Sequence, residues 1–289
     1  MTLRTRLASG NILLAPGIFD GLTAAIAEAA GFEALYLSGA AVAYTRLGRP
    51  DIGLTSVTEM AETMALVRDR VSLPVIIDAD TGFGNALNAQ RTMRLYERAG
   101  ASALQVEDQT FPKRCGHLSD KSLIPAGEMM GKIAAMADAR ASDDTLIIAR
   151  TDAIAVEGFG PALERAENYL TAGADALFIE APRTSEELAE IAQHFSGRAP
   201  LLANMVEGGA TPIKSTEDLQ ALGYSIAIFP GGIVRALAKT ATDYYASLQQ
   251  HGSNKPFSEQ MFDFRGLNET LGTDALLADG ARFADGASD

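Results

Sequence analysis

The chain has 289 residues, with 24 Lys and Arg against 37 Asp and Glu, and a net charge of −13 at pH 7. This acidic balance argues against nucleic-acid binding, which depends on basic groups that neutralise phosphates. A single cysteine excludes an intramolecular disulfide and any multi-cysteine metal cluster. No apolar run approaches the roughly 18 residues that cross a bilayer, and the first one is too short for a signal peptide. We therefore expect a cytoplasmic protein without nucleic-acid or membrane partners.

Short apolar runs alternate with longer segments of helical pattern along most of the chain. The apolar runs predict eight strands, at Ile12–Ala15, Ala34–Ser38, Pro74–Asp80, Ala103–Glu107, Thr145–Arg150, Ala176–Glu180, Leu201–Asn204 and Ile226–Phe229. Each run is continuous rather than alternating, which is typical of strands buried on both faces of a parallel sheet. Helices are predicted after the strands, at Gly21–Ala30, Val57–Arg70, Ala86–Ala99, Ala126–Ala141, Gly160–Ala172, Ser185–His194, Ser215–Leu222 and Ile233–Gln250.

Eight strand–helix units in about 250 residues predict an α/β fold of the (β/α)8 TIM barrel type, spanning residues 1–250. The alternative is an open doubly wound sheet, which usually has a glycine-rich first turn. The first turn expected here, 16–20, lacks that pattern. Residues 251–289 are predicted as a C-terminal helical extension, with helices at Glu259–Leu271 and Asp274–Phe283, that covers a neighbouring subunit or closes the barrel bottom.

Polar residues stand where six of the predicted strands end. In such barrels the chemistry lies at the C-terminal ends of the strands, so these residues should converge on one mouth. They are Ser38, Asp78 with Asp80, Glu107 with Asp108, Arg150 with Asp152, Glu180, and Asn204. No strand ends in lysine, which argues against a Schiff-base aldolase.

Three carboxylates at this mouth indicate a metal site. Asp78 and Asp80 are two residues apart on one predicted strand, so their side chains should point the same way, with Glu107 on the next strand. Such a group is costly unless a cation compensates it. Oxygen ligands favour Mg²⁺ or Mn²⁺. The alternative is that Asp78 or Asp80 only caps the turn at 81–84.

The single cysteine lies in a polar loop after the fourth strand. Lys113, Arg114 and His117 flank Cys115, and such cations lower a thiol's pKa towards neutrality. A thiol of that kind can donate or accept a proton at carbon. A preceding proline and Gly116 indicate a loop that can close over the mouth. The alternative is that the cysteine is inert filler.

Six stretches together resemble the isocitrate lyase/phosphoenolpyruvate mutase superfamily. The resemblance runs from about Ile12 to Gln250, and its Lys-Arg-Cys-Gly-His loop marks the carbon–carbon lyase branch, which includes 2-methylisocitrate lyases and 2,3-dimethylmalate lyases. The stretches are Tyr36-Leu-Ser-Gly, Leu47-Gly-Arg-Pro-Asp-Ile-Gly, Asp78-Ala-Asp-Thr-Gly-Phe-Gly, Val106-Glu-Asp-Gln, Lys113-Arg-Cys-Gly-His and Ala149-Arg-Thr-Asp-Ala.

The resemblance implies a homotetramer, built as a dimer of dimers that exchange the eighth helix. It also implies Mg²⁺ or Mn²⁺ held by Asp78, Asp80 and Glu107, partly through water, and a small carboxylate substrate. The implied substrate-binding residues are Ser38, Gly39, Ala40, Arg114, Gly116, Arg150, Glu180, Asn204 and Arg235.

The implied reaction breaks the C2–C3 bond of a 2-hydroxy di- or tricarboxylate. The products are pyruvate or another 2-oxo acid and a carboxylate such as propionate or succinate. Tyr36 is the implied base, with a carboxylate-bound water as the alternative, and Cys115 protonates the carbanion. Lys113 and His117 are the other implied catalytic residues, His117 through charge or a hydrogen bond to the substrate carboxylate.

Two departures from the methylisocitrate lyase pattern bear on the substrate. The stretch 44–46 is bulkier and more basic than the small residues usual there, and 205–209 resembles the dimethylmalate side. An alkyl-substituted dicarboxylate such as 2,3-dimethylmalate is therefore favoured, with 2-methylisocitrate close behind. Oxaloacetate hydrolysis, and a phosphonopyruvate or carboxyphosphonoenolpyruvate mutase-type activity, are the alternatives.

Overall fold

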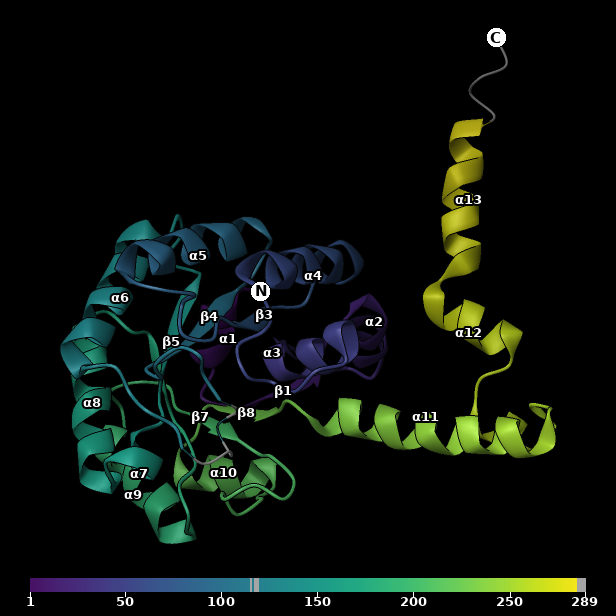
Figure 1. Ribbon diagram of the computed structural model, residues 1–289. Coiled ribbons are helices and arrows are strands. Elements are labelled where there is room, and N and C mark those ends of the chain that lie inside the picture. Colours follow the sequence, from purple (N-terminus) through teal and green to yellow (C-terminus); the bar gives the residue numbers. More distant parts are fainter. Residues whose placement is uncertain (115, 117–119, 285–289) are drawn as a thin grey trace. The chain divides into compact units, whose positions relative to one another are not determined.

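The structure is a computed structural model that describes residues 1–114, 116 and 120–284. The chain divides into two compact units, Met1–Val234 and Arg235–Asp289. The first unit holds all the strands, surrounded by helices (Figure 1).

Eight parallel strands form one sheet in the order β6-β5-β4-β3-β2-β1-β8-β7. A bridge between Leu177 of β6 and Leu201, next to β7, joins the two edges, so the sheet is nearly closed. This confirms the (β/α)8 barrel, and each predicted strand overlaps an observed one. The strands are β1 Leu13–Ile18, β2 Leu35–Leu37, β3 Val75–Asp78, β4 Ala103–Glu107, β5 Leu146–Thr151, β6 Ala176–Ile179, β7 Leu202–Asn204 and β8 Ile226–Phe229.

The first strand extends further than the sequence predicted. Residues 16–18, expected in a turn, belong to β1, which pairs with β8 up to Pro16 and with β2 at Gly17 and Ile18. A side chain at Gly17 would lie 2.3 Å from the Pro230 carbonyl oxygen. Glycine therefore lets β1 continue close beside the end of β8.

The helices mostly follow the predicted ranges because their ends carry capping residues. Ser56 and Glu59 form a capping box at the start of α4, and Gly223 ends α10 in the left-handed conformation. Four short elements, α1, α3, η1 and α7, were not predicted. The helical elements of the first unit are α1 Leu3–Leu7, α2 Gly21–Ala29, α3 Gly39–Val42, η1 Ala43–Leu47, α4 Val57–Arg70, α5 Ala86–Arg98, α6 Ala126–Ala139, α7 Ala153–Val156, α8 Phe159–Thr171, α9 Ser185–Phe195 and α10 Thr216–Leu222.

The core has two layers. One fills the barrel interior with alternate strand residues, and Leu3 of α1 packs among them. The larger layer lies between the strands and the surrounding helices. Strand residues are thus buried on both faces, which explains their continuous apolar character.

Helix α11, Gly232–His251, starts at the end of the first unit and continues into the second, which also contains η2 Lys255–Gln260, α12 Phe264–Leu271 and α13 Thr273–Ala284. The helix predicted at 259–271 is interrupted, because Met261 is extended and the Asp263 side chain caps α12. No helix in the described residues is long and apolar enough to cross a membrane. The domain boundary at residue 250 and the helix exchange stay predictions.

Candidate active site

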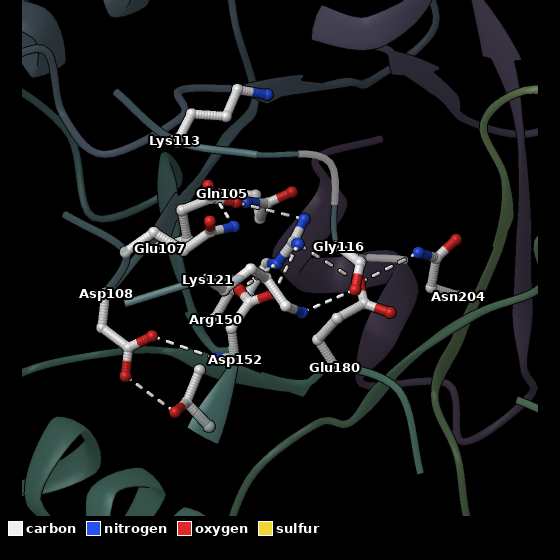
Figure 2. Close-up of polar contacts among 12 residues, drawn as sticks. Gln105, Glu107, Asp108, Lys113, Gly116, Lys121, Arg150, Asp152, Glu180 and Asn204 are labelled. Carbon is white, nitrogen blue, oxygen red and sulfur yellow. Dashed lines mark hydrogen bonds and ion pairs between the residues drawn. The ribbon is translucent and has the colours of Figure 1, made fainter. Parts of the chain in front are cut away.

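Charged side chains are buried together at the C-terminal ends of β3 to β6. Asp78 and Glu107 are the last residues of their strands. Arg150 is the second-last residue of β5, and Glu180 follows β6. Each of these four is at most 8 % exposed. The convergence expected from the strand ends is therefore present, as Figure 2 shows for residues from β4 to β7.

Arg150 is the centre of the largest ion-pair group in this mouth. Its guanidinium lies 3.1 Å from Glu107 Oε2, 2.9 Å from Asp152 Oδ2 and 3.5 Å from Glu180 Oε2. Burial alone would raise the pKa of Asp152, but Arg150 and Lys121 hold that pKa below its usual value. Asn204 joins the group by donating from Nδ2 to Glu180 Oε2 at 3.1 Å.

A second group surrounds Lys113, whose Nζ lies 2.5 Å from Asp51 Oδ1 and 2.7 Å from Asp80 Oδ1. Asp80 lies beyond the end of β3 with φ 45°, so the expectation that both aspartates stand on one strand was wrong. Its amide donates to Asp78 Oδ1 at 3.1 Å, so the Asp78 side chain accepts from the backbone two residues on, ahead of the turn expected at 81–84. Burial raises the pKa of Asp80 to about 7, although Lys113 opposes the shift.

Asp78, Asp80 and Glu107 supply oxygen donors of the kind that a divalent ion prefers. Burial raises the pKa of Asp78, Asp80 and Glu107, because it removes each carboxylate from water. The neighbouring carboxylates raise these pKa values further. Within the described ranges, no three His, Cys, Asp or Glu side chains form a ready-made cage. Mg²⁺ is usually bound through one or two carboxylates and several waters. The oxygen donors thus fit a small divalent ion, and in the protein alone Lys113 and Arg150 balance part of their charge.

Tyr36, the predicted base, is buried inside the barrel. Its hydroxyl donates to Gln105 Oε1 at 2.5 Å. Burial, with Asp78 and Glu107 nearby, raises its pKa well above the usual value for tyrosine. In the protein alone the phenol is thus a protonated hydrogen-bond donor.

The residues predicted to bind the substrate carboxylate begin a short helix. The Ser38 side chain accepts from the Ala41 amide at 3.2 Å and caps α3, so Gly39 and Ala40 form its first turn. A side chain at Gly39 would lie 3.0 Å from Asp78 Oδ2. Free amides at a helix start suit a carboxylate, and these adjoin the acidic group.

The Gln109 side chain holds the backbone of the loop after β4 against the mouth. The Gln109 side chain donates to Glu107 Oε1 at 3.0 Å and to the Arg114 carbonyl at 2.8 Å. Cys115 and His117 lie outside the described residues, so their roles stay predictions. The Arg114 guanidinium contacts Asp120 at 3.2 Å and is 45 % exposed. Arg235 belongs to the second unit.

Gly116 lies so close to the ion-pair group that no side chain fits. An added Cβ would lie 2.4 Å from Arg150 Nη2 and 2.9 Å from the Glu180 carboxyl carbon. We expect Gly116→Ala to move the loop away and to lower kcat/KM about 10- to 100-fold, with little change in unfolding free energy. Gly127→Ala, at a helical glycine with open space around it, is the control. Wild-type kinetics for Gly116→Ala would contradict this close contact.

Three residues at the mouth were not predicted as site residues. Asp51 lies in a loop between η1 and α4, Gln105 within the apolar β4 run, and Lys121 after the cysteine loop. Asp51 belongs to one of the stretches that carry the family resemblance, which was the only signal for it. A polar residue inside an apolar run was the signal for Gln105.

The match to known proteins covers most of the chain. Residues 3–249 match the family described as phosphoenolpyruvate phosphomutase. The chain belongs to the phosphoenolpyruvate mutase/isocitrate lyase superfamily. This confirms the resemblance found in the sequence.

Two relatives in this superfamily are lyases. The chain is 40 % identical to 2,3-dimethylmalate lyase of Eubacterium barkeri over 274 residues, which cover 95 % of this chain and 94 % of that one. It is 45 % identical to 2-methylisocitrate lyase of Aeropyrum pernix over 262 residues, 91 % of this chain and 83 % of the relative. The relatives by sequence thus include both lyases that the cysteine loop indicated.

Solved structures of the superfamily share the fold. A 2,3-dimethylmalate lyase superposes with a TM-score of 0.92 at 33 % identity, covering 99 % of this chain and 95 % of that one. Oxaloacetate acetylhydrolase, bound to 3,3-difluorooxalacetate, gives 0.90 at 30 % identity, with 97 % and 96 % covered. Phosphonopyruvate hydrolase, in complex with oxalate and Mg²⁺, gives 0.88 at 33 % identity, with 98 % and 100 % covered.

Proposed function

We propose that this protein is a Mg²⁺- or Mn²⁺-dependent carbon–carbon lyase. It cleaves the C2–C3 bond of an alkyl-substituted 2-hydroxy dicarboxylate such as 2,3-dimethylmalate, and 2-methylisocitrate is the next candidate. The products are pyruvate or another 2-oxo acid and a carboxylate such as propionate or succinate. The observation that carries the proposal is the buried acidic group beside the loop lysine at the barrel mouth, in a chain similar to both lyases.

Asp78, Asp80 and Glu107 would hold the metal ion, partly through water. The bound ion supplies positive charge that stabilises negative charge on substrate oxygens. The start of α3, at Gly39 and Ala40 behind the Ser38 cap, binds the carboxylate next to the hydroxyl-bearing carbon, together with Arg150. Lys113 adds a second positive charge beside Asp80.

The residues of the chain then move two protons. A base takes the proton of the substrate hydroxyl, the C2–O bond becomes a carbonyl, and the C2–C3 electron pair passes to the departing fragment. Tyr36 is the candidate base once it has lost its proton, and a carboxylate-bound water is the alternative. Cys115 donates a proton to the carbanion carbon, and His117 supports the substrate carboxylate.

The remaining predicted residues complete the pocket. Arg114 and Gly116 contribute from the loop, and Gly116 lies against Arg150. Glu180 lies beside Gly116 and, with Asn204, lines the same part of the mouth, where their mutual hydrogen bond orients the amide. Arg235 is proposed for the second carboxylate.

The proposal includes a cytoplasmic helix-exchanged tetramer. Large apolar side chains of the second unit are solvent-exposed, among them Phe264 at 89 % and Leu276 at 72 %. Exposed apolar surface of this kind is typical of interfaces between subunits. Light scattering at several concentrations tests the tetramer.

A substrate panel tests the activity. We expect 2-oxo acid release from 2,3-dimethylmalate or 2-methylisocitrate with Mg²⁺, a loss of at least about 100-fold in EDTA, and recovery when excess Mg²⁺ returns. Isocitrate and other alkylmalates complete the panel. Equal rates with EDTA and Mg²⁺ would refute the metal's role, and no release from any compound would refute the lyase.

Oxaloacetate hydrolysis is the second candidate, because oxaloacetate acetylhydrolase shares the fold at a TM-score of 0.90. Release of oxalate and acetate from oxaloacetate, without cleavage of alkylmalates, would favour it. Phosphonate chemistry of the mutase type is checked by phosphorus NMR with phosphonopyruvate, where we expect no change.

A further inference from the structure

Lys121 connects two parts of the mouth, and the function proposed above gives it no role. Its Nζ donates to the Gly116 carbonyl at 2.5 Å and to Asp152 Oδ1 at 2.7 Å (Figure 2). The Lys121 side chain is 2 % exposed and that of Asp152 is fully buried. A buried ammonium that joins a loop carbonyl to a carboxylate is a short, charge-assisted link.

The Asp152 end of this link is firmly anchored. Arg150 donates to both oxygens of Asp152, and the Asp152 amide donates to Asp108 Oδ1 at 3.0 Å. Asp108 also accepts from Thr151 and Tyr169, each at 2.7 Å. The carboxylate that receives Lys121 is thus fixed to the end of β5 from several sides.

The Gly116 end of the link lies in a tightly packed place. The Gly116 Cα has no room for a side chain against Arg150 and Glu180, so the loop backbone must be placed accurately there. The preceding residue in the sequence is Cys115. A displacement of the Gly116 carbonyl would therefore also displace the attachment point of the thiol.

We propose that Lys121 is a positioning residue, which fastens the cysteine loop to the end of β5 by joining the Gly116 carbonyl to Asp152. Its catalytic consequence rests on the lyase function proposed above. The fastening itself does not, because it involves only residues of this chain. Since Arg150 still pairs with Asp152 when Lys121 is replaced, the barrel should keep its fold.

Two measurements on the full-length protein test this role. Lys121→Met should lower kcat/KM for the cleaved substrate about 10- to 100-fold, with most of the loss in kcat. Trypsin should cut it after Arg114 at least about 10-fold faster than wild type, since a released loop becomes a cleavage site. Lys121→Arg, which keeps the charge, should restore part of both properties.

Arg198→Met is the matched control, because Arg198 pairs with Glu167 at the surface of the first unit and its side chain is 48 % exposed. It should match wild type in both measurements. Faster trypsin cleavage at sites along the whole Lys121→Met chain, with a lowered melting temperature, would indicate a general loss of structure and overturn the proposal. Wild-type cleavage after Arg114 would also overturn it. If wild type cleaves no compound of the panel, the lyase function fails, while the trypsin result still decides the role of Lys121.

Discussion

Arg150→Met is expected to lower activity steeply and to destabilise the barrel. Three buried carboxylates, those of Glu107, Asp152 and Glu180, surround the guanidinium, and all three have side chains at most 1 % exposed. Removing one partner from a buried ion pair usually costs about 3–5 kcal/mol, because the remaining charge stays out of water. Lys121 continues to pair with Asp152, so the loss of stability should come mainly from the buried charges of Glu107 and Glu180.

The folded Arg150→Met variant should also lose activity, for a reason that is independent of its lower stability. Arg150 is proposed to bind the substrate carboxylate, so kcat/KM should fall at least about 100- to 1000-fold. Urea unfolding gives the stability and 2-oxo acid release gives the activity of the folded variant. Arg150→Lys should recover most of the stability but little activity, because an ammonium does not reproduce the planar fork of guanidinium donors.

Arg140→Met is the matched control for Arg150→Met. Arg140 pairs with Asp175 at 2.7 Å just after α6, away from the strand ends that form the mouth. It should cost stability and leave kcat unchanged. Arg150→Met with wild-type kcat/KM would show that the guanidinium only balances charge in the core.

Cys115→Ser should lower kcat by about 100- to 10,000-fold while pyruvate and Mg²⁺ still bind. The reason is chemical, because a serine hydroxyl is a far weaker acid than a thiol and donates poorly to a carbanion. Calorimetric titration of pyruvate with Mg²⁺ measures binding, and single-turnover cleavage measures the chemical step.

The sequence supplies a clean control for this variant. Cys115 is the only cysteine, so iodoacetamide should inactivate the wild type in proportion to one thiol labelled and leave Cys115→Ser unlabelled. Wild-type kcat in Cys115→Ser would defeat the proposed lyase mechanism. Loss of pyruvate binding would instead assign the thiol to the structure of the pocket.

The prediction that polar side chains converge at one mouth succeeded because strand ends are a local property. Asp78, Glu107 and Arg150 each follow or close an apolar run, and the barrel brings such ends together whatever the loops do. The prediction that Asp80 lies on the same strand as Asp78 was wrong. Asp80 has a positive φ, and the alternation of side chains along a strand does not reveal such a backbone conformation.

The sequence by itself determined the strand and helix pattern, the barrel and the superfamily, because these depend on periodicity and on motifs of neighbouring residues. Only the tertiary structure showed that Lys113 pairs with Asp51, and Lys121 with Asp152. Ion pairs between such distant segments arise when packing removes the groups from water, so charge alone does not indicate which partners meet. The same packing decides that Gly116 lies against Arg150.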